Sequence, residues 1–206
     1  MKGNIKAFWK SLIPHVMPED QKVIGIIGTG RGVGVTHLAV MTAGYLSGVM
    51  RNRCAVLEWN SHGDFLNMRR VCGKEKDLNG GWRILETDYY EEAGIDTLLL
   101  CKKSGYQAVI VDYGTVTQGS LREFLRCDRQ FVLGSLSEWQ MEAFLEFEGK
   151  RNKTKKSWET LVTFGSEESR KNMEKRLKIP VRRVPVSVDA FAVTGEVICF
   201  YQQFFK

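Results

Sequence analysis

The sequence predicts one α/β domain, a three-layer α/β/α sandwich built on a mainly parallel sheet of about seven strands. Short runs of β-branched and apolar residues alternate along the chain with longer stretches of helical periodicity, as in a sheet covered on both faces. A glycine-rich turn joins the first apolar run, residues 23–28, to the first helical stretch. The 206 residues suffice for one full core. We place this domain at residues 21–206, after an N-terminal segment of residues 1–20.

Strands are expected where apolar runs are short and bounded by turn residues. They are residues 23–28, 54–59, 82–85, 107–112, 130–133, 160–164 and 181–186. Helices are expected where apolar residues recur every three to four positions. They are residues 35–49, 91–103, 121–126, 138–150, 166–177 and 194–205. The run QAVIVD at 107–112 is the clearest buried strand, since it stays apolar until its final acid.

Composition is that of an ordinary globular protein, with 43% hydrophobic and 26% charged residues. No run reaches the about 18 consecutive apolar residues that span a bilayer. The five cysteines show no C-x-x-C spacing, so we expect reduced thiols in the cytoplasm rather than a zinc site or disulfides. A net charge of +6 permits contact with nucleic acid or an anionic membrane. No base-reading motif is visible, and the basic run at 150–156 is typical of a solvated helix end.

The turn after the first strand, GTGRGVGVTH at residues 28–37, has the composition of a phosphate-binding loop. Glycines let the backbone turn tightly and aim N–H groups at phosphate oxygens, and the helix that follows favours an anion. Against the pattern G-x-x-x-x-G-K-[ST], Gly34 is the second glycine and Thr36 the hydroxyl that binds Mg²⁺. Thr29 stands in place of the first glycine and Val35 in place of the lysine. A plain tight connection between strand and helix would also explain the glycines.

The Gly-Val-Gly-x-Thr core after a buried strand resembles the deviant phosphate loop of the MinD/ParA-type ATPases of the SIMIBI class, and further matches follow in family order across residues 22–206. These ATPases carry a signature lysine near the start of the loop, where this chain has Gly30. Both lysines are therefore missing, and Arg31 is the only nearby cation. The resemblance implies a degenerate nucleotide-binding set. Its members are Gly30, Arg31, Gly32, Val33, Gly34, Val35, Thr36 and His37.

Two strand ends resemble the acidic positions of the same family. Glu58 matches the first acid of a D-x-D pair, while Asn60 replaces the second, which orients water. Asp112 matches the Walker B aspartate that helps to hold hydrated Mg²⁺. The resemblance therefore implies a metal site of Thr36, Glu58 and Asp112. As ordinary structural residues, Asp112 would cap the turn after its strand and Glu58 would be a solvated acid at a sheet edge.

The C-terminal part, residues 184–197, resembles the segment around the adenine pocket, which assigns Pro185 and Asp189 to an adenine region. The implied ligand is ATP or ADP with Mg²⁺, although losses in the loop leave open that none binds. His37 stands early in a helix, where packing or exposure to solvent is the more common role.

These losses predict a pseudo-ATPase. Phosphoryl transfer depends on positioning and charge stabilisation, and the two lysines and the water-orienting acid supply both. We expect a homodimeric scaffold or positioning factor for a pilus, secretion or other cell-envelope assembly, similar to the TadZ/CpaE-type proteins. The alternatives are an active ATPase in DNA partitioning or division-site placement, and a DNA-binding module that uses the basic surface.

The N-terminal segment has helical periodicity, with apolar residues on one face and lysines on another. They are Ile5, Phe8, Trp9, Leu12 and Ile13 on the first face and Lys2, Lys6 and Lys10 on the second. A basic amphipathic helix with a tryptophan suits peripheral contact with the inner face of a membrane through residues 2–13. A helix packed on the domain or on a partner would show the same pattern.

Overall fold

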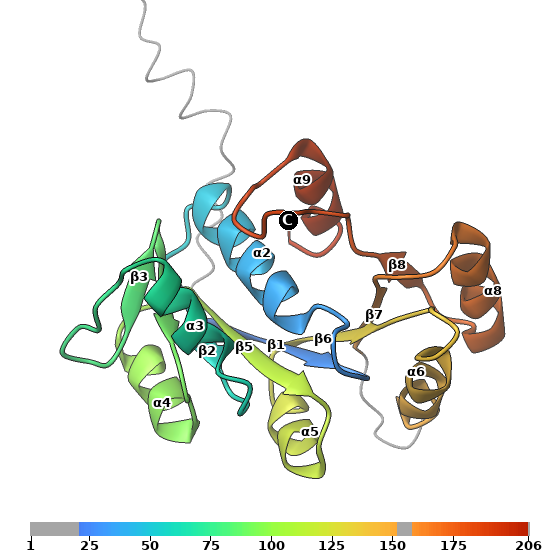
Figure 1. Ribbon diagram of the computed structural model, residues 1–206, viewed down its shortest axis with the longest axis horizontal. Helices are drawn as coiled ribbons and strands as arrows, with labels where there is room; N and C mark the ends of the chain where they lie inside the picture. Colours follow the sequence, from blue (N-terminus) through green and yellow to red (C-terminus); the bar gives the residue numbers. More distant parts are fainter. Residues whose placement is uncertain (1–20, 152–157, 206) are drawn as a thin grey trace, which may run out of the picture.

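The strand β1 (Lys22–Gly28) lies at the centre of the sheet, and all its residues except Lys22 are buried. The computed structural model describes residues 21–151 and 158–205. In it, β1 pairs in parallel with β5 (Ala108–Thr115) on one side and with β6 (Arg129–Gly134) on the other (Figure 1). The apolar sequence of β1 follows from this position, because a central parallel strand touches helices on both faces.

The sheet has eight strands in the order β3-β4-β2-β5-β1-β6-β7-β8. The remaining strands are β2 (Cys54–Glu58), β3 (Trp82–Ile84), β4 (Thr87–Tyr90), β7 (Glu159–Val162) and β8 (Val181–Arg183). All neighbouring pairs are parallel except β3 with β4, which closes one edge as an antiparallel pair. The predicted α/β class with a mainly parallel sheet is confirmed, with one strand more than expected.

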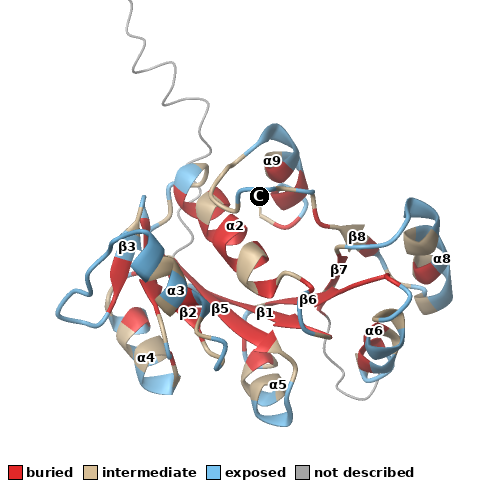
Figure 2. Ribbon diagram, in the orientation of Figure 1, coloured by how far each residue is buried: buried red, intermediate tan, exposed pale blue. Residues whose placement is uncertain are grey.

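Helices cover both faces of the sheet (Figure 1). They are α2 (Val35–Gly48), α3 (Asp64–Val71), α4 (Ile95–Lys103), α5 (Gln118–Phe124), α6 (Met141–Glu148), α8 (Glu167–Leu177) and α9 (Gly195–Tyr201). One apolar cluster joins α2, α3 and α9 to one face, and a second joins α4, α5 and α6 to the other. Burial is continuous through the sheet and along α2, while the outer faces of α4, α5 and α8 are exposed (Figure 2).

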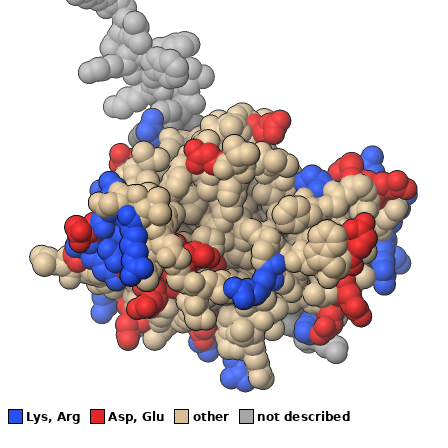
Figure 3. All heavy atoms as spheres, viewed as in Figure 1, with Lys and Arg blue, Asp and Glu red and all other residues tan. Residues whose placement is uncertain are grey.

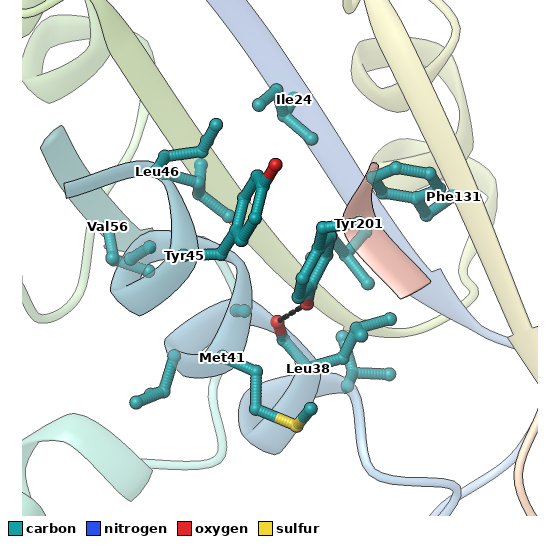
Figure 4. Packing of buried hydrophobic residues seen from close by; sticks show 14 of the residues in the cluster. Ile24, Leu38, Met41, Tyr45, Leu46, Val56, Phe131 and Tyr201 are labelled. Carbon is teal, nitrogen blue, oxygen red and sulfur yellow. Dashed lines mark hydrogen bonds between the residues drawn. The ribbon is translucent and has the colours of Figure 1, made fainter. Parts of the chain in front are cut away.

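The contact of α2 with α9 holds the C-terminal end of the described chain on the core. The rings of Tyr45 and Tyr201 stack with their centroids 5.0 Å apart. The Tyr201 hydroxyl lies 2.8 Å from Thr42 Oγ1 and donates to the carbonyl oxygen of Leu38 at 3.4 Å, the bond drawn in Figure 4. Burial raises the pKa of Tyr201, so this hydroxyl stays protonated. The pair fixes α2 against α9 through apolar area and a buried polar contact together.

Several element boundaries differ from the prediction. The helix expected from residue 91 begins at Ile95, and the one expected from 138 begins at Met141. The final helix ends at Tyr201 rather than at 205. Neither α3 nor β4 was predicted; α3 has only eight residues, of which Phe65 alone is fully buried.

The predicted amphipathic segment 1–20 and most of the basic run 150–156 lie outside the described residues. Within the described ranges, none of the helices combines the length and apolarity needed to cross a bilayer.

Replacing Tyr201 tests the α2–α9 contact. Tyr201→Ala should lower the free energy of unfolding by about 3–5 kcal/mol, because a fully buried aromatic side chain is lost. Tyr201→Phe should cost only about 1 kcal/mol, because Thr42 keeps a second partner in the carbonyl oxygen of Leu38. Urea unfolding of both variants measures the difference. If both variants lose the same free energy of unfolding, the hydroxyl rather than the ring of Tyr201 holds the contact.

Candidate functional site

The turn between β1 and α2 lies at the carboxyl edge of the central strand, where ligands of open α/β sheets bind. Its glycines are required by geometry. Gly32 and Gly34 have φ angles of 72° and 97°, which favour glycine. A Cβ on Gly28 would lie 2.7 Å from Cγ2 of Val35 and 2.8 Å from Cγ2 of Val33. The turn therefore closes tightly over the strand end and faces a cavity of about 270 Å³.

The cavity beside the loop has neither lysine nor arginine among the described residues of its lining. It is lined by Gly30, residues 32–37, His62, Asp64, Gly114 and Thr115. Val35, at the lysine position, is buried against Gly28. Arg31 is exposed at the tip of the loop, and its carbonyl oxygen accepts a hydrogen bond from Nε2 of Gln140 at 2.8 Å. What remains for an anion is the loop backbone and the start of α2.

Asp112 lies within β5, which continues to Thr115 rather than ending at residue 112 as predicted. It is fully buried, and both its carboxylate oxygens are hydrogen-bonded. Oδ2 accepts from Thr36 Oγ1 at 2.7 Å. Oδ1 accepts from the backbone N–H of Gly114 at 2.8 Å and from Nδ2 of Asn60 at 3.2 Å. The Asn60 amide is oriented by its own oxygen, which accepts from the backbone N–H of His62 at 2.9 Å. Burial raises the pKa of Asp112, and the bond from Thr36 opposes that shift.

Glu58, at the end of β2, acts as a cap for α3. Its Oε1 accepts from the backbone N–H groups of Asp64 at 2.7 Å and Phe65 at 3.3 Å. The side chain is buried rather than solvated, and burial raises its pKa. Glu58 lies directly opposite Asp112 in the pairing of β2 with β5. It therefore lies beside Asp112 in the sheet, while its Oε1 is committed to the start of α3.

Asp64 also lines the cavity beside the loop, and the sequence prediction did not include it. Its Oδ2 lies 3.2 Å from Thr36 Oγ1, so Thr36 sits between two carboxylates. Oxygen donors of this kind suit hydrated Mg²⁺, and Thr36 with Asp112 is the part of the predicted trio that the structure joins by a hydrogen bond. No cluster of three or more His, Cys, Asp or Glu side chains suited to a metal ion occurs in the described part of the chain. The signal that could have revealed Asp64 is an acid at a helix start just after a strand end.

A second cavity, of about 300 Å³, adjoins the first and is mostly apolar. Both are lined by His37 and by the loop, and the second also includes Phe164 after β7 and Pro185 after β8. Asp189 lies outside its lining and bonds its own turn, accepting from the N–H of Phe191 at 2.9 Å. The Nε2 atom of His37 is buried without a partner among the described residues. Apolar walls beside a phosphate loop could hold a flat aromatic base.

Burial lowers the pKa of His37, while the charge of Asp189 raises it. The imidazole is therefore no substitute for a permanently charged lysine, although it stands next to Thr36 in the sequence.

Comparison with known proteins gives a fold but no close relative. No family model and no curated protein sequence matches the chain. Solved structures do match. A putative plasmid partition protein from Borrelia burgdorferi B31, bound to AMPPNP, has a TM-score of 0.63 at 15% identity, over 89% of this chain and 96% of that one.

Two further matches belong to the same class. The MinD protein in a MinC:MinD cell division complex from Aquifex aeolicus has a TM-score of 0.59 at 16% identity, over 81% of this chain and 82% of that one. A ParA family ATPase from Chlorobium tepidum TLS has a TM-score of 0.58 at 16% identity, over 82% and 85%. Across more than four fifths of its length, this chain therefore has the fold of the MinD/ParA-type P-loop ATPases.

Proposed function

We propose that this protein is a scaffold or positioning factor of MinD/ParA fold whose nucleotide site no longer supports rapid hydrolysis. One observation carries the proposal: Asp112 is bonded by Thr36, Asn60 and Gly114, while the adjoining cavity has no lysine or arginine in its lining. Losing one charged contact to the transferred phosphoryl group costs roughly 10²–10⁴ in rate. Here the loop lysine, the signature lysine and the water-orienting acid are replaced by Val35, Gly30 and Asn60.

Binding of ATP or ADP with Mg²⁺ survives these losses better than hydrolysis does. The loop backbone, the start of α2 and the Thr36–Asp112 pair remain for phosphates and a hydrated cation. Pro185 contributes to an apolar cavity of suitable size for the base. The Thr36–Asp112 pair also favours the alternative function, an active ATPase in DNA partitioning or division-site placement.

We further propose a homodimer that acts in an envelope-associated assembly in the cytoplasm, similar to the TadZ/CpaE-type proteins. Its support is a group of exposed apolar side chains in the loops after β6, β7 and β8. They are Trp139, Phe164, Val186 and Val188, with exposed fractions of 82%, 55%, 88% and 102%. Figure 3 shows that the face seen in Figure 1 is mainly uncharged across its middle, with most lysines and arginines at its margins. A stable interface there would bury at least about 1,000 Å².

Hydrolysis of ATP by the purified protein should be at or near background, and Thr36→Ala should leave that rate unchanged. Val35→Lys should raise nucleotide affinity more than it raises hydrolysis, because Gly30 and Asn60 remain. Titration with ATP and Mg²⁺ beside a phosphate-release assay measures both quantities. A wild-type turnover of about 1 s⁻¹ or faster that disappears in Thr36→Ala would instead establish the active ATPase.

Asn60→Asp should make the fold depend on a divalent cation. The substitution replaces a donor to Asp112 with a second carboxylate about 3 Å away, so stability in EDTA should fall by about 1–3 kcal/mol. Added Mg²⁺ should restore much of this loss, since it binds the two acids together. Asn67→Asp on the exposed side of α3 is the matched control and should change little. Urea unfolding in EDTA measures the effect. If Asn60→Asp unfolds at the same urea concentration as the wild type, the Asn60 amide has no stabilising role.

The mass in solution should be that of a dimer both with and without Mg-ATP, because Gly30 removes the lysine that would reach a partner's phosphates. Replacing Trp139 and Val188 together by serine should give a monomer. Leu78→Ser, an equally exposed apolar residue in the loop before β3, should not. Light scattering decides the outcome. A mass that doubles only on addition of ATP would show a working nucleotide switch and would contradict the pseudo-ATPase proposal.

A further inference from the structure

A cavity of about 370 Å³ lies at the opposite edge of the sheet from the phosphate loop, where β1, β5 and β6 begin and where α2 ends. Its apolar walls come from Ile24, Leu46, Met50, Ala108, Phe204 and Phe205. Polar residues complete the lining: Lys22, Asn52, Gln107, Arg129 and Gln203. We call it the amino-edge cavity. Its volume falls in the range of about 300–1,000 Å³ that is usual for small-molecule sites.

Two cations line this cavity without an acidic partner among the described residues. They lie on neighbouring strands and on the same face of the sheet, because Arg129 pairs with Ile24 and Lys22 precedes Ile24 by two positions. Within the described part of the chain, no Asp or Glu lines the cavity. Asp128, next to Arg129 in the sequence, accepts instead from the backbone N–H of Val23 at 2.7 Å. The described residues therefore leave positive charge beside the apolar walls.

The position of Arg129 leaves its N–H groups free for an anion. Its guanidinium carbon lies 5.1 Å from the centroid of the Phe205 ring. Stacking of this kind uses the flat face of the guanidinium, while its N–H donors point outward in the plane. At the nearby end of α2, the carbonyl oxygen of Leu46 accepts from the backbone N–H of Asn52 at 2.9 Å. This carbonyl group is therefore satisfied and is not left to repel an anion.

We propose that the amino-edge cavity binds an amphiphile that has one medium-length alkyl chain and an anionic head group. The chain packs against the apolar walls, where each CH₂ group removed from water strengthens binding roughly three- to fourfold. The head group lies at the rim and accepts hydrogen bonds from Lys22 and Arg129. A polar anion would leave the apolar walls in contact with water, and an uncharged chain would leave the cations unpaired. This binding is independent of the nucleotide site.

Isothermal titration calorimetry of the full chain tests the proposal with a series of small ligands, each kept below the concentration at which it forms micelles. Decanoate should bind at a ratio of one to one. Its affinity should be roughly tenfold higher than that of octanoate, because two more CH₂ groups are buried. Decyltrimethylammonium has the same chain with the opposite charge, and inorganic phosphate has charge without a chain. Both should bind at least about tenfold more weakly than decanoate.

Four variants assign the binding to this cavity. Lys22→Gln and Arg129→Gln should each weaken decanoate binding at least about fivefold. Lys175→Gln removes one exposed charge on α8, outside the lining, and is the matched control that should leave the affinity unchanged. Met50→Trp places a larger side chain in the cavity, keeps both cations and should abolish binding. Urea unfolding without ligand shows whether each variant is folded. Lys22 is exposed at the start of β1, so its variant decides if the others are disturbed.

The proposal is overturned if decanoate does not bind, or if Lys22→Gln and Arg129→Gln bind it as tightly as the wild type. Equal affinity for decyltrimethylammonium would overturn it as well, since the apolar walls alone would then hold the chain. Sedimentation with vesicles of anionic phospholipid, without any binding of free decanoate, would assign the positive edge to a membrane and would also overturn it. Mg-ATP should leave the decanoate affinity unchanged, so failure of the proposed nucleotide site does not affect this test.

Discussion

The turn from β1 into α2 must close tightly over the end of the strand, because β1 is buried on both faces and α2 lies directly on the sheet. Only glycine at position 28 lets the side chains of Val33 and Val35 close over the strand end. The same closure fixes where α2 begins, and so places Thr36 at 2.7 Å from the carboxylate of Asp112 on the neighbouring strand. The candidate site is therefore a product of the packing that the central strand requires.

Loss of the lysines leaves this arrangement intact because apolar contacts hold the loop. Val33 and Val35 are buried, and neither depends on a bound anion. The buried carboxylate of Asp112 would be costly without partners, yet three donors satisfy it. A lysine in the loop would be stabilised by a bound phosphate, whereas Val35 is stabilised by burial in the apolar core. The loop and the carboxylate of Asp112 are therefore held in place by contacts within the domain.

The sequence predicts the features that depend on apolar pattern and fails on those that depend on tertiary contacts. Runs such as VIGIIG and QAVIVD fall in strands β1 and β5, since burial on both faces leaves few polar residues. Strand β4 reads Thr-Asp-Tyr-Tyr, and its burial comes from partners outside it: Asp88 binds Arg83 and Tyr106. A local pattern cannot show such partners.

The same limit applies at the site. The sequence places Thr36 and Asp112 at the same edge of the sheet, because each follows an apolar run that predicts a parallel strand. The cap from Glu58 and the approach of Asp64 depend on where α3 begins, which apolar spacing does not reveal. The bond from Asn60 depends in addition on an amide orientation that the backbone of His62 sets.

One helix connects the two edges of the sheet. α2 begins at the phosphate loop with Val35, has 14 residues, and ends about 21 Å away beside a cavity of about 370 Å³ at the amino ends of β1, β5 and β6. Coupling between sites needs an element with two discrete arrangements. α2 is buried along most of its length and is fixed to α9 by the stacked pair Tyr45–Tyr201, so it offers one well-packed position. A ligand in the cavity at the amino ends of the strands should therefore leave the phosphate loop unchanged, because the helix between them has no second packed position to adopt.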